Sequence, residues 1–251
     1  MSARAFLLPC LLLLPAVARG QPATQQPAPQ QPAPRRPAPG RDAPPARTGF
    51  QMALRLGWMS PAGNTSGASG DSLPARFSGQ LPLLLGLGGK ITDSLYVGGY
   101  LGASFGSDGS DVRVERACTD SDDNLHNDIA CNSMTLRIGL EAQYHFMPSA
   151  SVNPWLGYGI GPELASQSIT DRVRARDENT TVTGWEYARL AFGVDFRLAR
   201  GIGGGPLLEG TLGEFTHSRT EINGKVAHTG AISNTALHGW VSLGVRFVLF
   251  P

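Results

Sequence analysis

The stretch that decides the fold is Val-Ser-Leu-Gly-Val-Arg-Phe-Val-Leu, residues 241–249. Its side chains alternate along an extended chain: Val241, Leu243, Val245, Phe247 and Leu249 lie on one side, and Ser242, Gly244, Arg246 and Val248 lie on the other. Period-two alternation predicts a β-strand with two different faces. The inner face of a soluble sandwich should be apolar, and a second, mixed face that carries Arg246 is unusual there. In a transmembrane β-barrel apolar side chains face lipid and polar ones face the lumen, and the stretch fits that pattern.

Seven further segments after Arg47 alternate in the same way, which makes eight. They cover about residues 50–58, 81–90, 95–105, 134–146, 155–164, 188–198 and 207–215. Each is about nine to thirteen residues long, as a tilted strand that crosses a bilayer should be. The sequence therefore predicts an all-β protein, an eight-stranded antiparallel up-and-down transmembrane β-barrel over residues 48–251.

The connections between these segments differ in length. Polar stretches of roughly twenty residues follow the first, third, fifth and seventh segments, whereas short turns near residues 92–94, 148–153 and 200–203 join the others. Long loops on one rim and tight turns on the other are typical of outer-membrane barrels. An even number of strands then places both ends of the barrel on the short-turn side, in the periplasm.

The N-terminus has the features of an exported protein. Residues 1–20 combine a short basic start, a Leu-rich stretch and small residues before Gln21, which predicts a cleaved signal peptide. A membrane anchor is the alternative, but the stretch is short for a membrane helix and contains Pro9 and Pro15. After residue 20 no apolar run in the sequence is long enough for a membrane helix, so a membrane protein must cross with strands.

Residues 21–47 repeat a Gln/Arg-Pro-Ala-Pro unit. Such a segment cannot form a core and is expected to be a disordered, extended periplasmic tether. A passive spacer is the simpler interpretation. The alternative is that Arg35, Arg36, Arg41 and Arg47 contact peptidoglycan or another acidic periplasmic partner.

Composition excludes some classes of function. The net charge is +1 and only 16% of the residues are charged, so nothing indicates a nucleic-acid partner. Loss of the signal peptide removes Cys10 and leaves Cys118 and Cys131, which we expect to form a disulfide in an exported chain. Asp120, Asp122 and Asn124 between them are similar to the start of a calcium loop, but the required Gly and Glu are replaced by Leu125 and Cys131. We therefore predict a solvated acidic loop and neither a metal site nor a cofactor.

The strands, the sorted loops and residues 242–249 together resemble small eight-stranded outer-membrane barrels of the OmpA/OmpX type. Gly244, Phe247, Leu249 and Phe250 are similar to the C-terminal signal that the barrel assembly machinery reads, with Pro251 following the aromatic residue. The resemblance implies insertion into the outer membrane, contact with its lipid and lipopolysaccharide, and a monomeric state. Members that bind the cell wall carry a folded C-terminal domain for it, whereas here only the N-terminal tether is expected to be available for such a contact.

The predicted inward faces carry a nearly balanced set of charges. The set contains Arg55, Arg137, Arg189, Arg197 and Arg246 together with Glu141, Glu163, Asp195 and Glu209. Because eight strands enclose a space just wide enough for side chains, we expect these groups to form a salt-bridge network that plugs the lumen. A permeation path is the alternative.

These features predict a structural or surface-binding role. Two alternatives remain: a narrow channel for small or apolar solutes, and an enzyme that modifies lipid A. Such an enzyme is expected to show a His-any-Ser spacing, followed by a supporting acid on a strand. Neither His217 with Ser218 nor His228 with Ser233 shows that spacing, so we do not expect an enzyme.

Overall fold

The computed structural model describes residues 48–109, 129–172 and 175–249. The predicted signal peptide and tether, Cys118, the acidic loop and Phe250 lie outside the described residues and remain predictions. Within the described ranges the structure is almost entirely β-sheet.

Nine strands and one short helix make up this part of the chain. The strands are β1 (Gly49–Gly63), β2 (Phe77–Lys90), β3 (Leu95–Asp108), β4 (Ile129–His145), β5 (Val152–Asp171), β6 (Arg176–Ala199), β7 (Ile202–Ile222), β8 (Lys225–Ala231) and β9 (Leu237–Leu249). The helix α1 covers Leu73–Arg76. Among the described residues, no helix is long and apolar enough to cross a membrane.

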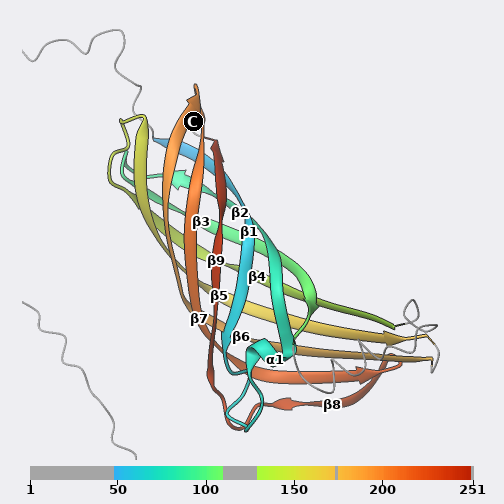
Figure 1. Ribbon diagram of the computed structural model, residues 1–251. Helices are drawn as coiled ribbons and strands as arrows, with labels where there is room; N and C mark the ends of the chain where they lie inside the picture. Colours follow the sequence, from blue (N-terminus) through green and yellow to red (C-terminus); the bar gives the residue numbers. More distant parts are fainter. Residues whose placement is uncertain (1–47, 110–128, 173–174, 250–251) are drawn as a thin grey trace, which may run out of the picture. The chain divides into compact units, whose positions relative to one another are not determined.

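Eight of the strands close into a ring (Figure 1). Strands β1 to β7 each pair with the next one along the chain, and β9 pairs with both β7 and β1. Every pairing is antiparallel. The predicted eight-stranded antiparallel up-and-down barrel is therefore confirmed, with the deciding stretch, residues 241–249, in the strand that closes it.

Side chains on the outer surface are apolar along most of each strand. In β9, for example, Val241, Leu243 and Val245 are exposed, whereas Ser242 and Arg246 are buried. Exposed aromatic residues mark both ends of this apolar belt: Phe50, Tyr144, Phe146 and Phe196 lie near the short turns, and Trp58, Phe105, Trp185 and Tyr187 lie near the other end. Aromatic girdles around an apolar band are typical of barrels in a bilayer.

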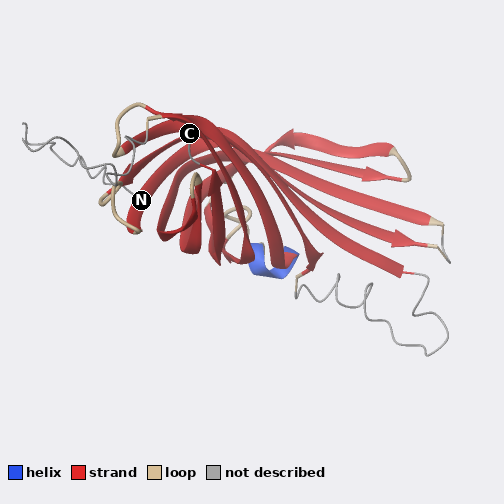
Figure 2. Ribbon diagram, turned by 90° about the horizontal axis from the view of Figure 1, so that it is seen from above, coloured by secondary structure: helices blue, strands red, loops and turns tan. Residues whose placement is uncertain are grey.

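The rim opposite the short turns differs from the prediction. Stretches that the sequence analysis assigned to long loops are strands: β5 continues to Asp171, β6 begins at Arg176 and β7 continues to Ile222. These strands project beyond the others, and β8 pairs with the projecting part of β7 (Figure 2). Their outward residues, such as Ser166 and Thr181, are polar, so the apolar alternation used to find strands is absent there.

The helix α1 lies in the connection between β1 and β2. Ser72 caps it by accepting a hydrogen bond from the Ala75 backbone N–H, and an ion pair of 2.6 Å joins Arg76 to Asp71. A helix of this kind was not predicted. It brings the fully buried Leu73 to the barrel, where it packs with Phe77.

Candidate functional site: the ionic lumen

The centre of the lumen holds an arginine between two carboxylates. Arg55 Nη2 lies 2.7 Å from Glu141 Oε2, and Arg55 Nη1 lies 3.3 Å from Glu209 Oε2. These side chains come from β1, β4 and β7 and are almost completely buried. Alternation places them inside, and closure of the ring brings them together.

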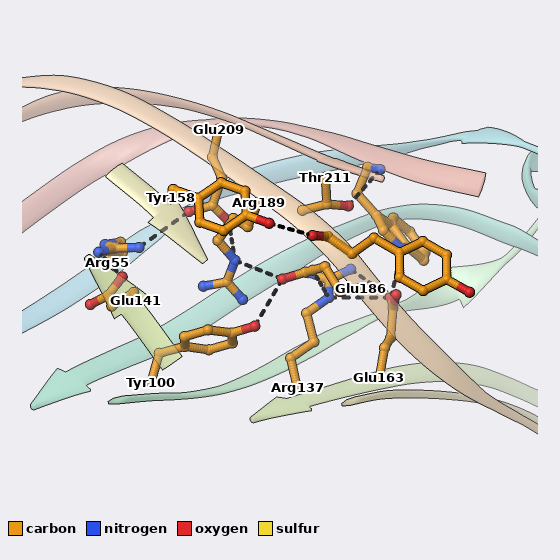
Figure 3. Close-up of polar contacts among 12 residues, drawn as sticks. Arg55, Tyr100, Arg137, Glu141, Tyr158, Glu163, Glu186, Arg189, Glu209 and Thr211 are labelled. Atoms are coloured by element: carbon orange, nitrogen blue, oxygen red, sulfur yellow. Dashed lines mark hydrogen bonds and ion pairs between the residues drawn. The ribbon is translucent and has the colours of Figure 1, made fainter. Parts of the chain in front are cut away.

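A second group continues from Glu209 toward the projecting strands (Figure 3). Arg189 Nε lies 3.5 Å from Glu209 Oε1 and 3.1 Å from Glu186 Oε1. Glu186 Oε2 in turn lies 3.4 Å from Arg137 Nε. The hydroxyl of Tyr100 donates a hydrogen bond of 3.0 Å to Glu186 Oε1. Glu186 thus connects two arginines across the lumen.

Glu163 ends this series on the side of the projecting strands. It accepts hydrogen bonds from Arg137 Nη2 at 2.9 Å and from the indole N–H of Trp240 at 2.8 Å. Its other oxygen lies 3.0 Å from His238 Nε2, and the His238 ring stacks on Phe215. A buried carboxylate with this many partners is held in one position.

Toward the short turns the series continues through Gln143. Its amide Nε2 donates to Glu141 Oε1 at 3.1 Å, and its Oε1 accepts from Arg246 Nη2 at 2.8 Å. Arg246 Nη1 lies 3.3 Å from Asp195 Oδ2. Polar contacts therefore run without a break from Glu163 to Asp195.

Four of the arginines also lie over aromatic rings, and Arg55 is the most distant, at 5.6 Å from the Trp155 ring centre. The guanidinium carbon is 3.7 Å from the Tyr100 ring centre for Arg189, 4.3 Å from that of Trp155 for Arg246, and 5.3 Å from that of Trp240 for Arg137. Cations gain from such contacts most when water is excluded. The rings also occupy space between the charges, which leaves little room for solvent.

Apolar side chains close the lumen beside Glu163. Buried members of this mouth cluster are Met59, Leu73, Phe77, Ala165, Val182, Phe215 and Trp240. Leu73 comes from α1, so the β1–β2 connection folds inward over the barrel. A cavity between the mouth cluster and Arg55 has room for about one water molecule.

Eight of the nine charged residues assigned to the lumen from the sequence are buried in this network: Arg55, Arg137, Glu141, Glu163, Arg189, Asp195, Glu209 and Arg246. Arg197 is not in the lumen, and its assignment was wrong. It is exposed near the end of β6, where its Nη2 donates to the Ser149 carbonyl at 3.5 Å. The strand continues past Asp195, but the enclosed space does not.

Two central residues were missed. Glu186 lies between two of the segments that alternate in the sequence. A register irregularity between Glu186 and Ala188 breaks the alternation, so that Glu186 and Arg189 both point inward. His238 precedes the first strand residue that alternation could identify, Val241. In the predicted inward set the arginines outnumber the carboxylates. This excess was the only signal in the sequence that a further buried carboxylate, such as Glu186, was needed.

The other predicted residues have different positions. Gly244, Phe247 and Leu249, assigned to the assembly signal, lie in β9, and the latter two side chains face outward. Cys131 lies near the start of β4, on the side of the projecting strands. Its pairing with Cys118 remains a prediction, because Cys118 lies outside the described residues. Within the described ranges, no group of three or more His, Cys, Asp or Glu side chains could hold a metal ion.

A closed ring of antiparallel strands with an apolar outer belt and an ionic interior satisfies its backbone within the bilayer and places its charges away from lipid. These features define an integral outer-membrane β-barrel. The structure is similar to those of Neisserial surface protein A (16% identity, 78% of this chain and 95% of that chain, TM-score 0.40) and Ail of Yersinia pestis (9%, 80% and 99%, 0.42). It is also similar to a major outer membrane protein from Thermus thermophilus (12%, 80% and 99%, 0.42).

The sequence comparisons give no further relationship. No protein-family model and no curated protein sequence matches the chain. The likenesses to solved structures concern the fold alone.

Proposed function

We propose that this protein is a closed outer-membrane barrel with a structural or surface-binding role, and that it does not conduct solutes. The observation that carries this proposal is the unbroken series of polar contacts from Glu163 to Asp195. It crosses the enclosed space from the mouth cluster toward the short turns. A solute could pass only if several of these contacts separated.

Separation of these pairs would be costly. Removal of one partner from a buried ion pair typically costs about 3–5 kcal/mol, because it leaves a charge without compensation. Arg55, Arg137 and Arg189 each contact two carboxylates. A passing solute would have to break several such contacts together, and it would then meet the apolar mouth cluster.

The projecting strands supply a surface for binding. Paired residues form an outward polar row across four strands, from Ser166 to Thr181, Arg219 and Thr229. Hydroxyl and guanidinium groups in a fixed row offer hydrogen bonds to a partner outside the membrane. Rigid sheet positions such groups more accurately than a long loop would.

Single-channel recording in planar bilayers tests the closed lumen. The wild-type barrel should show no steady conductance steps. A variant with Arg55, Glu141, Arg189 and Glu209 changed to Ala, and with Leu73→Ser in the mouth cluster, should conduct, which shows that the assay detects an open barrel of this size. Steady steps from the wild-type protein would overturn the proposal in favour of a narrow channel.

A further inference from the structure

A groove of about 330 Å³ lies on the outer surface across the neighbouring strands β1, β9 and β7. Its lining consists of Ala62, Gly63, Gly210, Thr211, Leu212, Leu237, His238, Gly239, Trp240 and Val241. The volume is within the range of roughly 300–1,000 Å³ found for small-ligand sites. Leu212, Leu237 and Val241 project from the apolar belt around it, so the groove opens toward lipid.

The groove coincides with an interruption in the β7–β9 ladder. Gly210 pairs with Val241 and Gly213 pairs with His238, but the two positions between them form no ladder pair. There the backbone N–H of Trp240 donates to the Thr211 side-chain oxygen at 3.0 Å (Figure 3). The side chain replaces the missing backbone contact and keeps the wall closed behind the groove.

Three glycines line the groove, Gly63, Gly210 and Gly239, and the fold requires all of them except Gly210. Gly63 has a φ of +83°, in the left-handed region, and a Cβ atom there would lie 2.5 Å from the Leu237 carbonyl oxygen. A Cβ atom at Gly239 would lie 2.3 Å from the Thr211 carbonyl oxygen, so the close approach of the strands excludes a side chain there. A Cβ atom at Gly210 would meet no atom within 4 Å, and its φ is not in the left-handed region. The fold therefore tolerates a larger residue at 210, and the missing side chain serves to keep the groove open.

We propose that this groove binds one acyl chain of a membrane lipid. The groove is continuous with the lipid-facing belt. It begins at Leu237, which pairs with Glu214, and extends from there toward the middle of the membrane. Within a bilayer, burial of apolar surface gives no driving force, and association depends on close van der Waals packing, for which small residues leave room. A chain seated over Gly210 between Leu212 and Val241 would gain contacts that a smooth strand surface does not offer.

Photolabelling of the full chain in vesicles tests the site. The probe is a phosphatidylethanolamine that carries a diazirine on one acyl chain, and the labelled residues are mapped by peptide mass spectrometry. Labelling should concentrate on the segments around residues 210–212 and 237–241. Gly210→Leu, which fills the groove, should reduce it to the level of the remaining belt. Gly89→Leu places the same side chain at a lipid-facing position with no groove and should leave the labelling unchanged.

Three results would overturn this assignment: uniform labelling around the belt, unchanged labelling in Gly210→Leu, or displacement of the probe by free hexadecane but not by unlabelled phosphatidylethanolamine. The last result would identify a free apolar solute as the occupant. Mapping of the wild-type protein alone decides the first point, so the test does not depend on the variant folding. The site requires insertion into a membrane but not a closed lumen, and conductance would not affect it.

Discussion

Arg55 Nη2 and Glu141 Oε2 lie 2.7 Å apart in the lumen, although 86 residues separate them in the chain. Neither strand can place its charge inside a membrane until the ring has closed, because each charge would face hydrocarbon or remain without a partner. The contact therefore links the stability of β1 and β4 to closure of the whole barrel.

Glu141→Ala should strongly destabilise the barrel while leaving insertion intact. The change leaves Arg55 with only the longer contact to Glu209 and removes the acceptor for Gln143, so a loss of about 3–5 kcal/mol is expected. The free energy of unfolding can be measured by urea titration in lipid vesicles. Glu178→Ala, which breaks the exposed pair with Arg176, is the matched control and should change stability by less than about 0.5 kcal/mol. Equal stability of the two variants would mean that the lumen is filled with water.

Asp195→Ala and Arg246→Met should be strongly non-additive. Asp195→Ala alone leaves the fully buried Arg246 cation without its carboxylate and should cost about 3–5 kcal/mol. The double variant has no unpaired charge, and the Met side chain can pack against Trp155, so most of the loss should be recovered. A double-mutant cycle of unfolding free energies measures the coupling. Simple addition of the two losses would show that the pair does not interact energetically.

Gly139→Ala should perturb the network from the barrel wall. A Cβ atom at this inward position would lie 2.2 Å from the Ile160 carbonyl oxygen and 2.5 Å from the Tyr100 ring, which contacts both Arg189 and Glu186. Overpacking of this kind costs about 1–3 kcal/mol. Gly89→Ala, where the nearest atom would be 3.7 Å away, is the control and should be nearly neutral. The thermal midpoint of heat-induced gel mobility reports both, and a neutral Gly139→Ala would contradict the packing.

Alternation in the sequence predicted the barrel because lipid requires an apolar side chain at nearly every outward position within the belt. The rule fails where that requirement ends. Beyond the belt, Ser166 and Thr181 face water, so β5 and β6 continue as strands without apolar alternation. Past Asp195 the strand continues but the lumen does not, which explains the wrong assignment of Arg197. Glu186 was missed because a register irregularity turns two nearby residues inward, and strand periodicity cannot reveal an irregularity.

Lysine labelling on intact cells tests the orientation of the barrel. The chain contains only Lys90 and Lys225. Lys225 is exposed at the projecting end of the β7–β8 hairpin, whereas Lys90 is buried at the short-turn end of β2. With the projecting strands outside the cell, an impermeant amine-reactive biotin reagent should label the peptide that contains Lys225, and Lys225→Arg should abolish the signal. If Lys225 reacts only after the outer membrane has been permeabilised, the projecting strands face the periplasm, and a role for them in binding at the cell surface is excluded.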